Sequence, residues 1–227
     1  SLTKAEPYHP RFIESGREDI LRTYDYLEHM ELSGLLRKLH TARTIYCFGT
    51  GYAQRNAVQE FAKSMQVCGK FCHVIPARNE FESTMSAMNQ DDVVILVSFS
   101  GQTENMREHV KMLALRKIPM IAITAIGVNF MSSYAEYSLH YQTTPTQLST
   151  QRKPYHSFVA LSVLLDYIVR RYIDHVETQQ RGNSTKTAQV LENSEFSAET
   201  GALDVADIRA QAGAVAIDRQ HTDPSET

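Results

Sequence analysis

Apolar and polar positions along the chain alternate in a way that predicts strands and helices in turn. Residues Val93-Val94-Ile95-Leu96-Val97 form a continuous apolar run, which is typical of a strand buried on both faces of a parallel sheet. Shorter apolar runs predict four more strands, over residues 44–48, 71–75, 119–124 and 137–141. Apolar residues at helical spacing lie between these runs. The pattern therefore predicts an α/β fold, a three-layer αβα sandwich with a five-stranded parallel sheet.

Helices are also expected outside this alternating region. One runs from about Phe12 to Leu27, and a second begins near Ser33, a residue type that favours the N-cap. Residues Tyr155 to Ile173 are apolar almost all round, so we expect a helix that is buried in the core or across a subunit interface. Right-handed crossovers should place the first and third strands side by side at the point where the strand order reverses.

Composition changes near the end of the chain. We expect N-terminal helices over residues 1–42, the α/β domain over 43–178 and a polar tail over 179–227. The tail is rich in Ser, Thr, Gln, Asn and Glu, with four basic against eight acidic residues, which predicts disorder. The chain begins without a methionine, which indicates either a piece of a longer protein or a residue added in cloning.

Overall composition excludes several classes of protein. Of the 227 residues, 42% are hydrophobic, and residues 1–178 carry 19 basic against 18 acidic side chains, so no general nucleic-acid-binding field is expected. No signal peptide or membrane-spanning run is present in the sequence, and we expect a cytoplasmic protein without a membrane partner. The cysteines Cys47, Cys68 and Cys72 lack zinc spacing and are interpreted as reduced core residues. No metal and no cofactor are expected.

A polar run follows the apolar strand directly. Ser98, Ser100 and Thr103 supply three hydroxyl groups around Gly101, at the junction of a strand and the next helix. The first N–H groups of a helix have no internal partner and carry partial positive charge, so this junction favours an anion such as phosphate. The alternative is ordinary helix capping, but one cap needs one hydroxyl. The sequence therefore favours a phosphate site.

The segment Ser98-Phe99-Ser100-Gly101-Gln102-Thr103 resembles the Ser-x-Ser-Gly-x-Thr signature of sugar isomerase (SIS) domains, and the resemblance spans roughly Leu35 to Ile173. It implies the flavodoxin-like SIS fold and phosphosugar binding by Ser98, Ser100, Gly101, Gln102 and Thr103. The resemblance also implies that the turn Gly49-Thr50-Gly51 lines the same pocket. Ala53 departs from the serine that is usual in that turn. A dinucleotide site is disfavoured, because the third glycine and the acidic residue of that fingerprint are missing.

Catalytic candidates are few. Enzymes of this family use a glutamate base, which makes Glu82 and Glu80 candidates, with Arg78 as a pairing partner. Carboxylates that do no chemistry are the more common case at a helix start, because the helix dipole favours acidic residues there. His156 resembles a family position that closes the sugar pocket across a dimer. Arg152 and Lys153 are candidates for reaching a bound phosphate, although solvated loop charges are more common.

Three functions are compatible with these features. The resemblance is greatest to the phosphosugar-sensing domain of RpiR-type transcriptional regulators, which implies a homodimer or tetramer and DNA binding only through a helix-turn-helix domain outside this chain. The second function is an aldose–ketose phosphosugar isomerase on the same fold, which requires a positioned base. A purely structural dimerisation module leaves the hydroxyl cluster unexplained. The sequence therefore favours a sensor that is not an enzyme.

Overall fold

The computed structural model of the chain describes residues 9–147 and 149–199, with side chains from Arg11 to Gly182 apart from residue 148. The chain divides into two compact units, Ser1–Val176 and Glu177–Thr227. All five strands lie in the first unit. The division falls close to the boundary expected from composition at residues 178 and 179.

The five predicted strands form one parallel sheet. They are β1 (Ile45–Gly49), β2 (Cys72–Val74), β3 (Val93–Val97), β4 (Met120–Ala125) and β5 (Tyr137–Tyr141). Their order in the sheet is β2-β1-β3-β4-β5, and every neighbouring pair is parallel. The predicted fold class and the predicted adjacency of the first and third strands are both confirmed.

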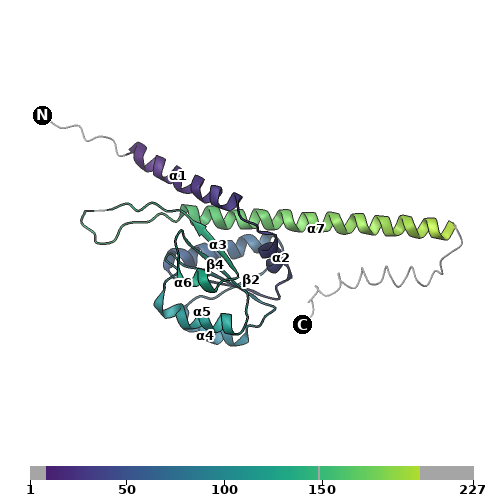
Figure 1. The fold of residues 1–227 in the computed structure, drawn as a ribbon, viewed down its shortest axis with the longest axis horizontal. Coiled ribbons are helices and arrows are strands. Elements are labelled where there is room, and N and C mark those ends of the chain that lie inside the picture. Colours follow the sequence, from purple (N-terminus) through teal and green to yellow (C-terminus); the bar gives the residue numbers. More distant parts are fainter. Residues whose placement is uncertain (1–8, 148, 200–227) are drawn as a thin grey trace. The chain divides into compact units, whose positions relative to one another are not determined.

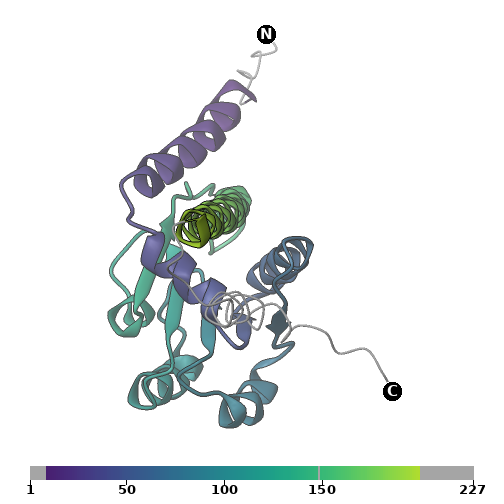
Figure 2. The same cartoon turned by 90° about the vertical axis from the view of Figure 1, so that its right-hand side faces the viewer.

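Helices cover both faces of this sheet (Figures 1 and 2). One face packs against α1 (His9–Glu28), α2 (Ser33–Thr41), α3 (Tyr52–Val67) and the part of α7 (Val159–Glu199) that belongs to the first unit. The other face packs against α4 (Arg78–Ala87), the short helix η1 (Glu104–Met106), α5 (Arg107–Leu115) and α6 (Phe130–Tyr134). The architecture is therefore a three-layer αβα sandwich.

The alternation of side chains along each strand divides the core into two clusters. In β3, Val93, Ile95 and Val97 face the α3 and α7 side, whereas Val94 and Leu96 face the α4 and α5 side. All five are at most 2% exposed. A strand of this kind must be apolar at every position, which explains why its sequence shows no alternation.

Helix α1 is fixed to the segment after β5 by buried polar groups. The carboxylate of Asp19 accepts hydrogen bonds from the backbone N–H of Thr144 at 2.8 Å and from the Thr144 hydroxyl at 2.7 Å. The hydroxyl of Thr23 accepts a hydrogen bond from the backbone N–H of Gln142 at 2.9 Å. Asp19 and Thr23 are at most 5% exposed. These bonds satisfy backbone groups of the connection that leads from β5 toward α7.

One predicted helix start, one predicted helix end and one predicted N-cap differ from the structure. Tyr155 is not helical; it forms an antiparallel bridge with Thr146, and α7 begins at Val159. The helix continues to Glu199 instead of ending at Ile173, so residues 179–199 of the expected tail are helical; residues 200–227 lie outside the described residues. Ser33 is the first helical residue of α2, and the N-cap is Leu32, which makes no side-chain cap bond.

Candidate functional site

The first and third strand–helix turns lie side by side at the carboxyl edge of the sheet. Gly49, the last residue of β1, pairs in register with Val97, the last residue of β3. The backbone N–H of Thr50 donates to the carbonyl of Val97 at 2.9 Å. The structure therefore brings Thr50 next to the turn formed by residues 98–103, as the predicted strand order requires.

The buried hydroxyl of Ser98 stabilises the turn after β3, residues 98–103, which is called the third-strand turn below. Ser98 is 1% exposed, and its Oγ accepts a hydrogen bond from the backbone N–H of Gly101 at 3.1 Å. It also lies 3.2 Å from the hydroxyl oxygen of Thr103. Three hydroxyls were expected to face a ligand. The Ser98 hydroxyl instead stabilises the turn, and Thr103 is half-buried beside it.

No hydroxyl of this turn caps the helix that follows. Thr103 occupies the N-cap of η1 without a side-chain cap bond, and Met106 occupies the N-cap of α5, again without one. Ser100 is exposed, and its Oγ accepts from the N–H of Gln102 at 3.2 Å. The alternative that this polar run serves as an ordinary helix cap is therefore wrong. Its hydroxyls stabilise the turn itself or remain accessible at its surface.

Gly101 adopts a backbone conformation that the turn requires. Its φ is +62°, in the left-handed region that glycine tolerates. A Cβ atom built on Gly101 would also collide with the side chain of Asn129. The carbonyl of Gly101 accepts from the N–H of Met131 at 3.0 Å. The turn is thus packed directly against the N-terminus of α6.

Asn129 was not identified from the sequence as a site residue, although it supports the turn. Its side chain is 5% exposed, and Oδ1 caps α6 by accepting from the N–H of Ser132 at 2.9 Å. Its Nδ2 donates to the hydroxyl of Thr124 at 3.0 Å and to the carbonyl of Gly127 at 3.1 Å.

The Thr124 hydroxyl extends this support to a histidine. Thr124 is fully buried, and its Oγ1 lies 2.9 Å from Nδ1 of His140 on the neighbouring strand. Burial lowers the pKa of His140, and hydrogen bonds to the carbonyls of Ala125 and Thr124 oppose that shift only in part. The imidazole ring also contacts Tyr26 of α1 edge to face, at 5.7 Å between centroids. The side chains of Asn129, Thr124 and His140 therefore form a polar network that supports the turn.

The glycines of the first turn, residues 49–51, allow α3 to pack closely against the end of β1. A Cβ atom on Gly49 would collide with the backbone of Gln54, so β1 and α3 can approach this closely only with glycine there. Gly51 is the N-cap of α3 in an extended conformation. Gln54 itself is 4% exposed. These contacts explain the Gly-x-Gly spacing by packing, without a nucleotide.

The guanidinium of Arg107, which was not identified from the sequence, lies beside this turn. The Arg107 guanidinium donates from Nη2 to Oε1 of Gln102 at 3.3 Å, and its Nε lies 3.0 Å from a carboxylate oxygen of Glu104. It also stacks over the ring of Phe130, 4.4 Å from the centroid. Arg107 therefore orients the amide of Gln102 and adds positive charge at the edge of the turn.

His156 is brought to the same turn. Its ring packs on Phe99, the second residue of the motif, with 4.5 Å between centroids. Its Nδ1 is buried and has no hydrogen-bond partner among the described residues. Phe158 contacts Phe99 from the same connection, at 6.2 Å. The connection before α7 thus covers one side of the third-strand turn.

The other candidates are not joined to the two turns. Glu80 and Glu82 are exposed on α4, and within the described residues neither carboxylate hydrogen-bonds to a turn or pairs with Arg78. The expected pairing of Arg78 with these carboxylates is therefore wrong. Arg152 and Lys153 are exposed in the connection after β5. Of the candidate acid–base groups, His156 alone contacts the motif within the part of the chain that the structure describes.

This arrangement is suited to binding a small anion. Backbone N–H groups, the Ser100 and Thr103 hydroxyls and the amide of Gln102 are donors for phosphate oxygens. Across residues 9–147 and 149–199, no three His, Cys, Asp or Glu side chains gather in a way that would hold a metal ion. The helices of that region also include none long and apolar enough to cross a membrane.

Comparison with known proteins defines the family. The family model described as SIS domain matches residues 38–170, which is more than half of the chain. This chain belongs to the SIS domain family. The resemblance found in the motif at residues 98–103 is thereby confirmed, and the match covers all five strands and the start of α7.

Among SIS proteins, transcriptional regulators are similar to this chain. The HTH-type transcriptional regulator GlvR of Bacillus subtilis (strain 168) is 23% identical over 166 residues, which is 73% of this chain and 65% of GlvR. The sugar isomerase domain of an RpiR transcription factor from Sphaerobacter thermophilus is 14% identical, with a TM-score of 0.62, over 80% of this chain and 99% of that one. Vibrio vulnificus NanR, solved with ManNAc-6P, is 20% identical, with a TM-score of 0.61, over 80% of this chain and 69% of the NanR chain. The predicted likeness to RpiR-type regulators is therefore confirmed.

Proposed function

We propose that this SIS domain binds a phosphorylated sugar at the two adjacent turns. The phosphate lies against the third-strand turn, where the Ser100 and Thr103 hydroxyls and the side-chain amide of Gln102 donate hydrogen bonds. The first turn, residues 49–51, lies against the sugar. One observation carries this proposal: the turn is built from hydroxyls that do not cap a helix, around a glycine in the left-handed conformation. Such a turn presents several donors to one anion.

The proposed role is that of the effector-sensing part of an RpiR-type transcriptional regulator, which acts in the cytoplasm. Membership of the SIS family and the similarity to GlvR and NanR support this role. The chain spans 65% of the length of GlvR, so the DNA-binding function of a whole regulator is part of the proposal. DNA contact would be made by a helix-turn-helix domain outside these residues.

The sensor is proposed to be a homodimer or tetramer. A cleft of about 400 Å³ lies between α3 and α7, with Phe61, Leu165 and Val169 among its apolar lining residues and the exposed residues Glu60 and Asp166 among its charged ones. Phe61, Leu165 and Val169 are 3 to 8% exposed within one subunit, so a partner surface would contact chiefly the exposed polar and charged residues of this cleft. A second copy that packs a helix here would cover those residues.

Binding without turnover is the expected behaviour. Donors that hold the phosphate bind substrate and transition state alike, which gives affinity without rate. An aldose–ketose isomerase is the second candidate, and the contact between His156 and Phe99 favours it, because it places a titratable ring beside the motif. Isomerisation would require that ring, or Glu82, to reach the sugar carbons.

A panel of hexose and pentose phosphates, with ManNAc-6P included, tests the proposal. Calorimetric titration should identify at least one ligand, and NMR of the same mixtures should show no interconversion of any aldose and ketose. Interconversion at about 1 per second or faster, abolished by His156→Gln or Glu82→Gln, would establish the isomerase instead. Absence of binding to every member would contradict the phosphosugar site.

A further inference from the structure

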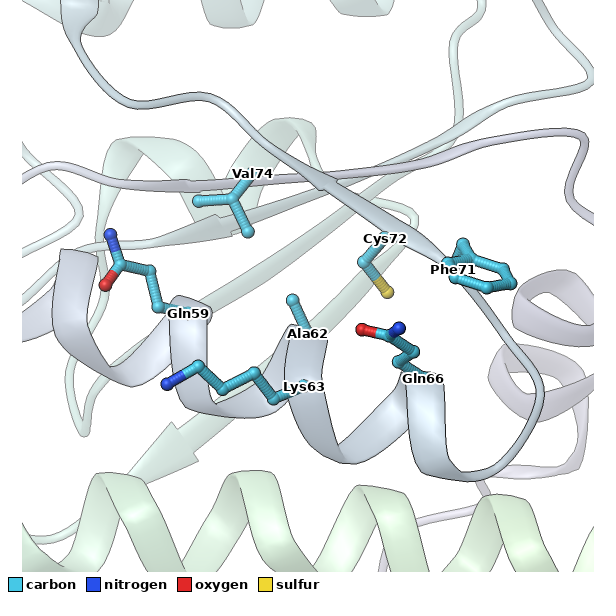
Figure 3. Close-up of a pocket in the computed structure, with 7 residues that line it drawn as sticks. All are labelled: Gln59, Ala62, Lys63, Gln66, Phe71, Cys72 and Val74. Atoms are coloured by element: carbon cyan, nitrogen blue, oxygen red, sulfur yellow. The ribbon is translucent and has the colours of Figure 1, made fainter.

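Cys72 lines a second cleft, away from the two turns. This cleft has a volume of about 240 Å³ and lies between α3 and the edge strand β2 (Figure 3). The Cys72 sulfur points from β2 toward α3, near Ala62 and Gln66, and Phe71 stands at the end of the cleft with 71% of its surface exposed. Cys72 is partly exposed and lines this cleft.

The three cysteines of the chain have different environments. Cys47 is fully buried in β1, where it lies two residues beyond Ile45, the register partner of Cys72. Cys47 and Cys72 therefore lie on one face of adjacent parallel strands, where an interaction between the two side chains affects the pKa of both thiols. Cys68 instead donates its own S–H to the carbonyl of Ser64 at 3.3 Å.

A fixed cation lies near Cys72. The ammonium group of Lys70 donates to the carbonyls of His40 and Ala42, both at 2.8 Å, which holds it in place. The interaction with Cys47 and the charge of Lys70 lower the pKa of Cys72, although burial opposes the shift. The pKa of Cys47 is raised by that same interaction and by burial, and burial raises the pKa of Cys68.

We propose that Cys72 is a modification site, at which hydrogen peroxide that enters the α3–β2 cleft oxidises the sulfur to a sulfenic acid. The Cys72 thiolate attacks one peroxide oxygen, the O–O bond breaks as the S–O bond forms, and the departing hydroxide takes up a proton to become water. The sulfur loses two electrons and the peroxide gains them. The thiolate is the reactive form of cysteine, and Cys47 and Lys70 favour it at this position. This inference does not depend on the proposed sugar site.

Peptide mapping of the reduced full chain tests the assignment. Trypsin cleaves after Lys63, Lys70 and Arg78, which places Cys68 and Cys72 on separate peptides, and Cys47 falls on a third. The chain is treated with peroxide in the presence of dimedone, which traps sulfenic acid as a thioether. We expect the adduct chiefly on the Cys72 peptide. A larger share on Cys47 or Cys68, or no adduct at all, would overturn the proposal.

Rates of alkylation by iodoacetamide at pH 7 test the cause. Measured in a Cys68→Ala background, Cys47→Ala and Lys70→Met should each slow alkylation of Cys72 by about fivefold, because each removes one interaction with the thiolate. Cys47→Ser keeps a donor and should react nearly as fast as the parent chain. Lys63→Met is the matched control: Lys63 also lines the cleft, but its ammonium pairs with Glu60 at 2.9 Å. Equal rates in Cys47→Ala, Lys70→Met and the parent chain would refute the proposed activation.

Discussion

Gly101 and Asn129 are packed so closely that no Cβ atom fits between them. Gly101 belongs to the turn proposed to hold the phosphate, and Asn129 caps α6 and hydrogen-bonds to Thr124 in β4. The shape of the turn therefore depends on a residue 28 positions later in the chain. The binding groups and the helix that supports them form one packed unit.

Gly101→Ala should lower the free energy of unfolding by about 2 to 4 kcal/mol, because it adds left-handed strain and a steric collision. Urea denaturation measures the change. Gly69→Ala is a matched control, since Gly69 has φ +76° and open space where its Cβ would lie. We expect the control to lose only about 1 kcal/mol from backbone strain. Equal losses in the two variants would show that contact with Asn129 is unimportant.

A double-mutant cycle separates the collision from the strain. Asn129→Ala removes a helix cap and two further hydrogen bonds, so it should destabilise the protein by about 2 kcal/mol on its own. Combined with Gly101→Ala, it should cost less than the sum of the two single changes, because the collisions with Oδ1 and Cγ of Asn129 disappear and only the contact with Cβ of residue 129, at 2.9 Å, remains. Strict additivity in urea denaturation would contradict this packing.

Stability should fall in acid through Asp92. This carboxylate is fully buried and accepts hydrogen bonds from Arg43 at 3.0 and 2.6 Å and from the N–H of Asn89 at 2.8 Å. Burial alone would raise the pKa of Asp92, but these bonds outweigh it and lower the pKa. A carboxyl whose pKa is lower in the folded state stabilises the fold above its unfolded pKa of about 4 and loses this contribution as the pH falls further.

Arg43→Met tests this pair. The variant should be about 1 to 3 kcal/mol less stable at pH 7, and its difference from the parent chain should shrink below about pH 4. Thermal unfolding between pH 3 and pH 7 measures both effects. Arg37→Met removes an exposed arginine of α2 and serves as the control. A difference that stays constant down to pH 3 would exclude ionised Asp92 as its source.

Leu165→Asp should unfold the protein or dissociate its oligomer. Leu165 is 4% exposed and also lines the α3–α7 cleft, so an unpaired carboxylate there costs several kcal/mol. Leu161→Asp, at a fully buried position, should unfold the chain. Ile173→Asp on the same helix is the control, because Ile173 is 45% exposed. Analytical ultracentrifugation with circular dichroism would detect either effect, and an unchanged, folded assembly for Leu165→Asp would contradict the prediction.

The strands of the sheet could be predicted because each one is marked by an apolar run within a short stretch of sequence. The apolar run at residues 93–97 predicted both ends of β3, and the strand at 137–141 has its expected bounds. The start of α7 could not be found in this way, because the apolar character of residues 155–173 favoured a helix from Tyr155, whereas Tyr155 pairs with Thr146 and the helix begins at Val159. The helix also continues into a polar segment whose composition had favoured a tail.

The site was only partly visible in the sequence. The motif identified the third-strand turn, and the strand order placed Thr50 beside it. The inward role of Ser98 and the supporting roles of Asn129 and Gln54 depend on contacts between distant segments, which leave no periodic or spacing signal. Glu82 was a candidate because of its place in a helix, yet it is exposed on α4.

The most direct test of the central claim is calorimetric titration of the parent chain and of Ser100→Ala/Thr103→Ala with the phosphosugar that binds best in the panel. Each hydroxyl should contribute about 1 to 3 kcal/mol, the usual range for a hydrogen bond to a charged group. The double variant should therefore bind at least about thirtyfold more weakly, while Ser86→Ala on the exposed face of α4 binds like the parent chain. Unchanged affinity in a folded double variant would contradict the proposal that this turn holds the phosphate.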